Sequence, residues 1–328
     1  MNRLRSRVVG TGSYLPEKVM TNRDLELMVD TNDEWIVSRT GIRERRIAAD
    51  HEATSDLAYE ASRRALDAAG LRAHDLDLIV VATLTPDAPL PATAVYLQRR
   101  LGAKKAAAFD IMAACTGFVY GIAVVDGLIR TGVAKNCLLI GAEVLSRVMN
   151  WKDRGTCIIF GDGAGAAVLV PTHGRSGVLS THLYADGAQA ELLCIPGGGS
   201  RIPATHEVVE QGLQYVHMKG NETFKLAVKN MADAAVAALE ANDAASSDLA
   251  LLVPHQANIR IIEATAQRLH LPMSKVFVNI QRYGNTSGAT IPIALDEAVR
   301  EGRAATGDLV LLDAFGAGFT WGSALIRW

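Results

Sequence analysis

Residues 113–132 read AACTGFVYGIAVVDGLIRTG, and a related stretch, RYGNTSGATIPIALDEAVREG, occupies residues 282–302. Both stretches pass from a turn of small residues into a helix-like pattern and end on a glycine. Aligning them puts Cys115 opposite Asn285, which lies 170 residues further along the chain. A repeat at this distance predicts that the chain is built from two similar halves.

Two further pairs of segments support the repeat. Residues 75–81 form a strand-like run after an amphipathic helix at 55–71, and residues 248–253 follow a similar helix at 224–242, an offset of 173. The stretch IIFGDGAGAAVLV from Ile158 also resembles DAFGAGFTWGSALI from Asp313. Solenoid repeats have periods of roughly 20–50 residues, so this longer period indicates two packed halves instead.

The fold class follows from the alternation of strand-like and helix-like segments, which predicts an α/β protein with mainly parallel sheets and helical crossovers. We place the N-terminal half at residues 1–172, carrying Cys115, and the C-terminal half at residues 173–328, carrying His255 and Asn285. Residues 185–216 have little periodicity and are expected to form an irregular excursion. A pseudo-twofold axis between the halves would bring Cys115 and Asn285 together.

Composition and charge exclude several functional classes. The chain has 328 residues and a formal charge of -2, which gives no electrostatic case for binding nucleic acid or an anionic membrane. The N-terminus lacks the apolar core of a signal peptide, and no apolar run approaches the length of a membrane span. The four cysteines show no metal-ligand spacing, so we expect reduced thiols, no metal and a cytoplasmic location.

Cys115 has two interpretations. Free cysteine is most often a buried apolar filler. However, a thiol at a helix N-terminus has its pKa lowered by the helix dipole and by free N–H groups, which favours a nucleophilic thiolate. The second interpretation needs partners elsewhere in the chain.

His255 and Asn285 are the candidate partners of Cys115. His255, in VPHQAN, directly follows an apolar strand-like run, where ligands bind in α/β proteins, but its ring could simply be satisfied by backbone groups. Asn285, in YGNTSGA, could instead be a helix cap. A neutral histidine and an amide can both donate hydrogen bonds to an oxygen that gains negative charge. With no carboxylate evident beside the histidine, a donor role fits better than proton shuttling.

These motifs resemble the Cys-His-Asn set of β-ketoacyl-acyl-carrier-protein synthase III, a condensing enzyme with the thiolase fold. The resemblance extends from VVGTGSYLPE through DEWIVSRTGIRERRIA and IIFGDGAGAAVL to AFGAGFTWGSALIRW. It implies a homodimer with a five-layered αβαβα fold and no cofactor. It also implies transfer of a short acyl group from acyl-CoA, expected to be acetyl-CoA, to Cys115. Decarboxylation of malonyl-acyl carrier protein (malonyl-ACP) would then give 3-ketoacyl-ACP, the first step of fatty-acid synthesis.

The same resemblance implies roles for further residues. The backbone N–H groups of Cys115 and Ala317 would form an oxyanion hole, although the family often has glycine at the second position. The implied CoA-binding residues, with the adenine between Trp35 and Arg154, are Thr31, Trp35, Arg39, Arg154, Gly155, Gly220, Phe224 and Asn258. The implied docking residues for the acidic carrier protein are Lys225, Arg260 and Arg268. Leu90 would close the acyl pocket of the dimer partner.

Several structural and functional alternatives remain open. Trp35 could be half-buried against an arginine stem, and the basic residues could form an ordinary solvated face. GDGAG at 161–165 is followed by the strand-like AAVLV, so we reject a phosphate loop and expect a tight turn between paired strands. A relative using another starter in a secondary-metabolite pathway, or a non-catalytic acyl-CoA-binding protein, would also retain the CoA residues. A thiolase would need a second catalytic cysteine where GNTSGA has asparagine.

Overall fold

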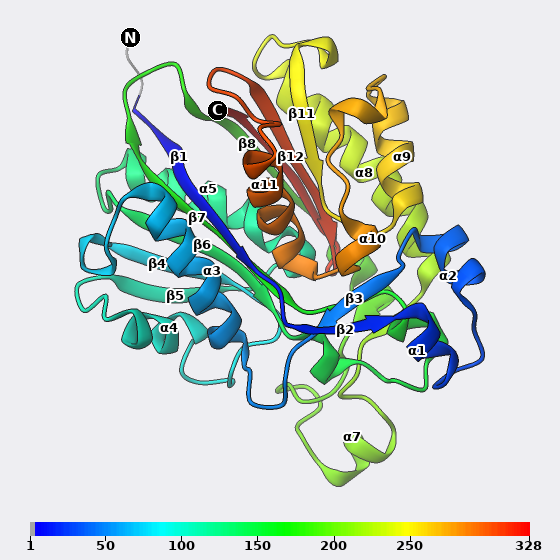
Figure 1. Cartoon of the computed structure of the whole chain (residues 1–328). Coiled ribbons are helices and arrows are strands. Elements are labelled where there is room, and N and C mark those ends of the chain that lie inside the picture. Colours follow the sequence, from blue (N-terminus) through cyan, green and yellow to red (C-terminus); the bar gives the residue numbers. More distant parts are fainter. Residues whose placement is uncertain (1–3) are drawn as a thin grey trace.

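The computed structural model describes residues 4–328 (Figure 1). Its strands are β1 (Arg5–Tyr14), β2 (Lys18–Thr21), β3 (Glu44–Ile47), β4 (Leu78–Ala82), β5 (Ala107–Ile111), β6 (Cys137–Glu143), β7 (Gly163–Thr172), β8 (Gly177–Ala185), β9 (Leu193–Cys194), β10 (His217–Met218), β11 (Leu249–Pro254), β12 (Leu309–Gly316) and β13 (Thr320–Arg327). Its α-helices are α1 (Asn22–Glu26), α2 (Asp33–Thr40), α3 (Thr54–Ala69), α4 (Thr93–Leu101), α5 (Gly117–Arg130), α6 (Arg154–Cys157), α7 (His206–Glu210), α8 (Gly220–Glu240), α9 (Ile259–Arg268), α10 (Ile280–Tyr283) and α11 (Thr290–Arg300). Short 3-10 helices are η1 (Ala73–Asp75), η2 (Ala114–Thr116), η3 (Leu145–Val148), η4 (Gly187–Leu192), η5 (Ser246–Asp248), η6 (Met273–Lys275) and η7 (Ser287–Ala289).

Two sheets form the centre of the molecule. One has the strand order β1-β7-β6-β4-β5 and the other has β11-β12-β13-β8. The two sheets have matching strand orders, in which β8, β13, β12 and β11 take the places of β1, β7, β6 and β4. In each sheet the second of these strands, β7 or β13, runs antiparallel to the strand before it in the chain. The place that β5 takes in the first sheet holds only an isolated bridge between Leu252 and Val276 in the second.

The prediction of mainly parallel sheets is wrong. Among the strand pairs of the two sheets within residues 4–328, only β4–β5, β4–β6 and β11–β12 are parallel, and the pairs of β1, β7, β8 and β13 are antiparallel. Antiparallel neighbours need no helical crossover, and β12 returns into β13 through a short turn. Both sheets are therefore mixed.

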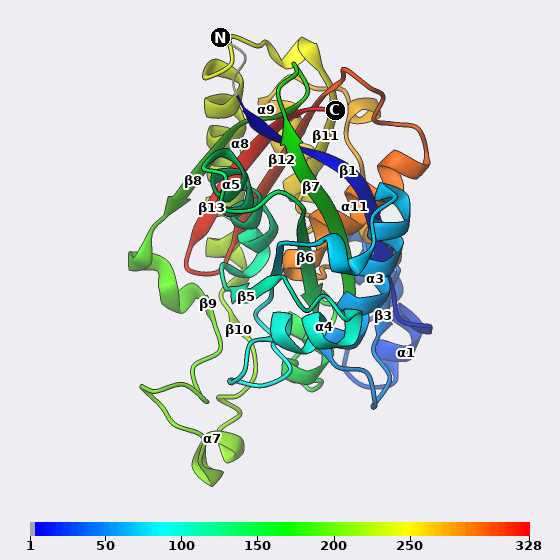
Figure 2. The same ribbon diagram turned by 90° about the vertical axis from the view of Figure 1, so that its left-hand side faces the viewer.

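The predicted five layers are confirmed (Figures 1 and 2). Helices α3 and α4 cover one face of the first sheet, where Ala61 packs with Ile140. Helices α5 and α11 lie between the sheets, with Ile122 and Leu295 in one core shared by both. Helices α8 and α9 cover the outer face of the second sheet. Each sheet is thus buried on both faces, which explains strands such as LIVVA and LLIGA that are apolar throughout.

The repeat is confirmed, but its register at the active helices differs from the predicted one. Helices α5 and α11 begin at Gly117 and Thr290, which are 173 residues apart. The preceding turns η2 and η7 also match at this offset, and each begins with a left-handed residue, Ala114 (φ 46°) and Ser287 (φ 49°). The structural equivalent of Cys115 is therefore Gly288, and Asn285 lies three residues earlier.

Position 288 holds a glycine because there is little space for a side chain. A Cβ at this position would lie 3.2 Å from the Ala114 carbonyl oxygen, because the turns η2 and η7 contact each other across the interface of the halves. The expected proximity of Cys115 and Asn285 holds even so, since Asn285 belongs to the same turn region.

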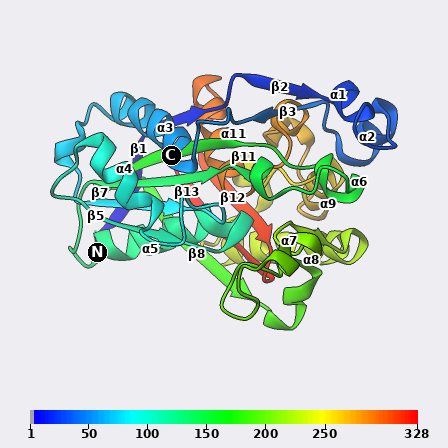
Figure 3. The same cartoon turned by 90° about the horizontal axis from the view of Figure 1, so that it is seen from below.

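The irregular excursion is also confirmed. Between β8 and α8 the chain forms only η4, β9, α7 and β10. It projects from one end of the molecule (Figures 2 and 3). Its residues Leu193 and Cys194 line a cavity together with Cys115. Among residues 4–328, none of the helices is both long and apolar enough to cross a membrane.

Candidate active site

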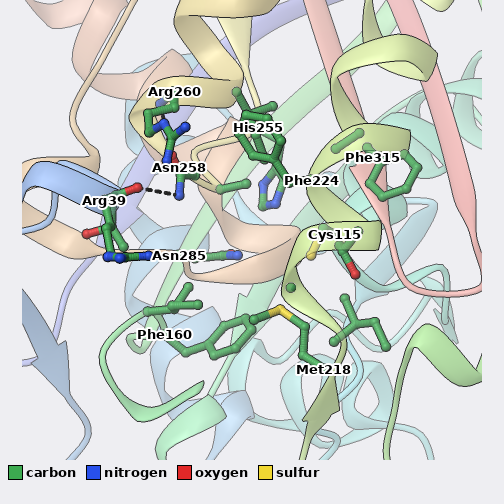
Figure 4. Close-up of a pocket in the computed structure, with 18 of the residues that line it drawn as sticks. Arg39, Cys115, Phe160, Met218, Phe224, His255, Asn258, Arg260, Asn285 and Phe315 are labelled. Atoms are coloured by element: carbon green, nitrogen blue, oxygen red, sulfur yellow. Dashed lines mark hydrogen bonds between the residues drawn. The ribbon is translucent and has the colours of Figure 1, made fainter. Parts of the chain in front are cut away.

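Cys115, His255 and Asn285 come from three separate segments and line one cavity of about 290 Å³ (Figure 4). Cys115 lies in η2, just after β5. His255 directly follows β11, and Asn285 lies in the turn before η7. The sequence therefore identified three residues that the tertiary structure brings together.

Cys115 is nearly buried and lies where two cavities meet. Its exposure is 6%, and it lines both the cavity shared with His255 and a second, mainly apolar cavity of about 500 Å³. Burial raises the pKa of the Cys115 thiol to about 12. The expectation of a lowered pKa at a helix N-terminus is therefore not met, because desolvation of the thiolate outweighs the favourable contacts.

The ring of His255 is held by a hydroxyl group. Its Nδ1 lies 2.7 Å from Oγ1 of Thr290, the first residue of α11, and its backbone N–H donates to the Asp313 carbonyl at 2.7 Å. Burial lowers the pKa of His255 to about 3, so the imidazole is neutral at physiological pH. The alternative of a ring satisfied by backbone groups is wrong, because the partner of Nδ1 is a side chain.

Asn285 has one end of its amide fixed. Its Oδ1 accepts the backbone N–H of Ser287 at 2.8 Å, and its own N–H donates to the Ile159 carbonyl at 2.9 Å. Asn285 does not cap α11, whose N-cap is Ala289. Because Oδ1 is occupied, Nδ2 is the atom left to donate hydrogen bonds into the cavity.

The outer part of the cavity carries aromatic and cationic side chains. The guanidinium carbons of Arg39 and Arg154 lie 4.6 and 4.8 Å from the centroid of the Trp35 ring. The Asn258 Nδ2 donates to the Arg39 carbonyl at 2.9 Å, the bond dashed in Figure 4. Six of the eight predicted CoA-binding residues line this cavity: Trp35, Arg39, Gly155, Gly220, Phe224 and Asn258.

Thr31 and Arg154 do not line the cavity. Arg154 instead donates to the Asp30 carbonyl at 2.7 Å while its guanidinium covers Trp35. The Thr31 hydroxyl is shielded from solvent and has no hydrogen-bond partner within residues 4–328. A planar ring could stack on Trp35 only after a guanidinium has moved aside.

The three basic residues predicted to dock a carrier protein lie on α8 and α9 and are exposed: Lys225, Arg260 and Arg268. Arg260 lines the cavity mouth, with its guanidinium 5.3 Å from the Phe224 ring centroid. Arg268 pairs with Asp233 at 3.1 Å, which neutralises part of this face.

The apolar cavity on the other side of Cys115 contains Ala317. Its lining also includes Met112, Leu145, Cys194 and Val216, so it is suited to a hydrocarbon chain. Leu90 does not line it and is 85% exposed on its own subunit.

The predicted turn at GDGAG is wrong, although the strand that follows is confirmed. Gly163 is the first residue of β7, and Gly165 lies within that strand. A Cβ at Gly165 would lie 2.6 Å from the Ile293 nitrogen of α11. These glycines therefore let the central helix α11 approach the sheet, and they lead into a strand and not into a helix N-terminus.

Sequence reasoning missed three polar residues behind the cavity: Glu143, Ser287 and Thr290. All three are buried, and Glu143 is the last residue of the otherwise apolar strand β6. A single carboxylate ending a buried strand was a usable signal. Within residues 4–328, no group of three or more His, Cys, Asp or Glu side chains is arranged to hold a metal ion.

Known families and proteins match the chain along its length. Family models described as 3-oxoacyl-[acyl-carrier-protein] synthase III and its C-terminal part match residues 109–187 and 239–328. A β-ketoacyl-[acyl-carrier-protein] synthase III of Caldanaerobacter subterraneus subsp. tengcongensis is 54% identical over 99% of this chain and 98% of its own length. The corresponding protein of Xanthomonas campestris pv. campestris is 56% identical, with 99% of both chains covered.

A solved structure gives the same answer for the fold. The crystal structure of 3-oxoacyl-[acyl-carrier-protein] synthase III from Aquifex aeolicus VF5 superposes with a TM-score of 0.92 at 48% identity, covering 98% of this chain and 100% of that one. Agreement in sequence and fold with this acyltransferase family argues against a non-catalytic acyl-CoA-binding protein. The chain therefore belongs to the β-ketoacyl-ACP synthase III family, the acyltransferases of thiolase-like fold whose condensation reaction initiates fatty-acid synthesis.

Proposed function

We propose that this enzyme transfers a short acyl group, acetyl in the first instance, from acyl-CoA to Cys115 and condenses it with malonyl-ACP. Loss of CO₂ from the malonyl group generates the carbanion that attacks the acyl-cysteine, giving 3-ketoacyl-ACP. The observation that carries the proposal is the convergence of Cys115, His255 and Asn285 on one cavity with Trp35 at its mouth. The thioester intermediate splits the acyl transfer into two easier steps.

His255 and Asn285 are assigned to stabilise the enolate that forms on decarboxylation. The Thr290 hydroxyl lies 3.0 Å from the Ser287 carbonyl and 2.7 Å from Nδ1 of His255, and its single hydrogen can serve only one of these acceptors. The donor role assigned to His255 requires that this hydrogen lies on the shorter contact, to Nδ1, which leaves the ring proton on Nε2. Nδ2 of Asn285 is the second donor. The N–H groups of Cys115 and Ala317 are assigned to the acyl carbonyl.

The CoA thioester is assigned to the outer cavity. Trp35 supplies a face for the adenine, and Arg39 and Arg154 supply cations that stack on rings or pair with phosphates. Arg154 would have to leave its present position over Trp35 to enclose the adenine. Thr31 is assigned as a CoA contact that forms only after Arg154 has moved away from Trp35.

We further propose that the active form is a homodimer. β5 is an edge strand of the first sheet, and most of its residues are half-buried rather than charged and solvated. Met112, just after β5, is 75% exposed, and Leu90 is 85% exposed. Exposed apolar side chains of this size, one of which directly follows an open edge strand, favour pairing with a second copy, whose Leu90 would close the apolar cavity.

The basic face of α8 and α9 is assigned to the acidic carrier protein. Arg260 is the strongest candidate because it is exposed at the cavity mouth, where the carrier's prosthetic arm would enter. Lys225 lies beside Phe224 on α8, whereas Arg268 must first give up its pairing with Asp233.

Two other expectations are retained as proposals. The five-stranded sheet is drawn from residues 5–172 and the four-stranded sheet from residues 177–327, which supports a boundary between the halves near residue 172. All four cysteines are free, which supports a reducing, cytoplasmic location.

The starter preference is tested by a panel of acyl-CoA substrates. We expect acetyl-, butyryl- and octanoyl-CoA each to add one acyl group to the protein, because the apolar cavity of about 500 Å³ far exceeds an acetyl group. Intact-mass spectrometry measures the adduct, and product assays with malonyl-ACP and malonyl-CoA identify the extender. Absence of any adduct with all three would refute the proposed acyl transfer.

Leu90→Phe should narrow this preference. Each buried methylene contributes about 0.8 kcal/mol where space exists, and a rigid ring supplied by the partner would remove that space. We expect octanoyl and butyryl transfer to fall several-fold while acetyl transfer is retained. Val133→Phe, at a 71% exposed position beyond the far end of α5, is the matched control. Equal losses with all three starters would contradict this role for Leu90.

A further inference from the structure

Glu143 is a buried carboxylate directly behind the Cys115 turn. Its exposure is 0%, and its Oε2 accepts hydrogen bonds from the Thr83 hydroxyl (3.1 Å), the Leu84 N–H (3.1 Å), and the Thr85 hydroxyl and N–H (2.6 and 3.2 Å). Its Oε1 accepts only a longer bond from the Leu84 N–H, at 3.3 Å. One carboxylate oxygen is therefore saturated, and the other retains accepting capacity.

The less occupied oxygen faces the turn η7. A Cβ built on Gly288 would lie 3.5 Å from Oε1, so the backbone next to Ser287 packs against this atom. Ser287 is 1% exposed, and its hydroxyl has no hydrogen-bond partner of ordinary geometry among residues 4–328. The turn η7, which begins with Ser287, contacts both β6, which ends in Glu143, and the Cys115 turn η2. The Ser287 hydroxyl lowers the pKa of both the Cys115 thiol and the Glu143 carboxyl.

Ser287 is held in this place by its backbone. Its φ of 49° is in the left-handed region, which serine adopts only at a cost. Its N–H is bonded to Asn285, and it lines the apolar cavity together with Cys115. Ser287 therefore carries a hydroxyl without a hydrogen-bond partner among residues 4–328, in a turn that packs against both the Cys115 turn and the strand that ends in Glu143, and it is placed to act as a relay.

The titratable groups around this point are few. Cys115 on η2 faces Glu143 of β6, while β4 and its following loop present only the hydroxyls and N–H groups of residues 83–85. His255 lies across the cavity. Among residues 4–328, no arginine, lysine or histidine forms an ion pair with Glu143. Burial raises the pKa of Glu143 to about 7, and the ionised carboxylate raises the pKa of Cys115.

The Cys115 thiol needs a proton acceptor before it can attack a thioester. Its pKa of about 12 leaves almost no thiolate at neutral pH. His255 is a poor acceptor, because its pKa is near 3 and because Nε2 already carries a proton in the tautomer assigned above. Glu143, with a pKa near the working pH, meets the requirement for a general base.

We propose that Glu143, acting through the Ser287 hydroxyl, takes up the proton of Cys115 during acylation and returns it during condensation. In acylation, the thiol proton passes to Ser287 Oγ as the Ser287 proton passes to Glu143 Oε1. The sulfur then bonds to the acyl carbon, and CoA thiolate leaves and takes a proton from solvent. In condensation, the carbanion bonds to the acyl carbon, the carbon–sulfur bond breaks, and neutral Glu143 reprotonates the released thiolate by the same route.

The physical advantage is a constant charge in a buried site. Before proton transfer the single negative charge is on Glu143, and afterwards it is on sulfur and then on the departing CoA. Two adjacent buried anions never coexist, which avoids the large cost of desolvating both. Glu143 is thus a positioning and proton-accepting residue that does not touch the substrate.

The test is the pH dependence of acetyl transfer from acetyl-CoA, followed by intact mass in single-turnover reactions. In the parent enzyme, Glu143 is protonated below about pH 7 and cannot accept, so the rate should rise through pH 7 and then level off. Glu143→Gln keeps an acceptor for the four hydrogen-bond donors but cannot take a proton. We expect its rate at pH 8 to fall by about 100-fold and the inflection near pH 7 to disappear.

Two further variants separate proton transfer from structure. Glu143→Asp should restore part of the acetyl-transfer rate together with the inflection near pH 7. Ser287→Ala should lower the acetyl-transfer rate, as Glu143→Gln does. Ser62→Ala removes another buried hydroxyl, on α3, that has no hydrogen-bond partner in the part of the chain that the structure describes, and it should leave the rate and the inflection unchanged. Thermal unfolding of each variant monitors the fold.

The inference rests on the proposed role of Cys115, and the two can fail separately. If the parent enzyme forms no acetyl adduct, the proposed function itself fails. If the parent is acetylated but Glu143→Gln keeps the rate and the inflection, the relay is wrong. An inflection that disappears in His255→Ala and persists in Glu143→Gln would assign the general base to His255, and the relay through Ser287 to Glu143 would be wrong.

Discussion

Cys115→Ala should abolish acyl-enzyme formation and reduce condensation by roughly 10⁴-fold or more, the scale seen when a covalent nucleophile is removed. Cys115→Ser should behave in the same way, because a hydroxyl is far less acidic than a thiol and therefore loses its proton far less readily, even to Glu143. The measurements are the intact mass after incubation with acetyl-CoA and the rate of 3-ketoacyl-ACP formation. Unchanged thermal unfolding would show that the fold is retained.

The other cysteines provide the control for this prediction. Cys137 and Cys157 have 0% exposure, so only the half-buried Cys194, which lines the same apolar cavity, can compete for an alkylating reagent. Cys194→Ser should keep the acyl adduct, and peptide mapping should place both adduct and alkylation on Cys115. Acylation mapped to Cys194 instead would remove Cys115 from the mechanism.

His255→Ala and Asn285→Ala should impair decarboxylation of malonyl-ACP far more than acetyl transfer to Cys115. Each removes one assigned donor to the enolate, and a preorganised donor is worth roughly 3 kcal/mol, or about 100-fold in rate. Release of CO₂ from malonyl-ACP and acetylation by mass spectrometry measure the two half-reactions separately. Asn242→Ala, near the far end of α8, is the matched control.

This prediction also discriminates between two roles of His255. If acetyl transfer falls as far as decarboxylation in His255→Ala, the imidazole is the base for the thiol and not a donor to the enolate. If neither half-reaction changes in Asn285→Ala, the orientation given to its amide by Ser287 has no catalytic use.

The sequence predicted the fold and the three central residues because both depend on local patterns. The buried strands at 78–82 and 249–254 are apolar runs, and the helices before them have clear amphipathic spacing. The repeat then implied that the strand-end segments of the two halves would meet. The sequence alignment misplaced the register of the repeat by three residues. It paired Cys115 with Asn285 because the surrounding segments look alike, whereas the starts of η2 and η7 pair Cys115 with Gly288.

The mixed sheets could not be read from the same patterns. A strand buried on both faces has the same apolar composition whether its neighbours run parallel or antiparallel. Likewise, the glycines of β7 resembled a turn because their actual partner, α11, lies more than a hundred residues away in the chain.

By itself, the sequence determined two α/β halves and the presence of Cys115, His255 and Asn285 at the ends of their strands and turns, and its resemblance to β-ketoacyl-ACP synthase III implied the five layers. Only the tertiary structure decided the chemical state of these groups. The raised pKa of Cys115, the neutral His255 held by Thr290 and the buried Glu143 behind Ser287 all arise from desolvation and from contacts between distant segments. Spacing along a chain fixes which residues share a face, but the free energy of a charge depends on everything packed around it.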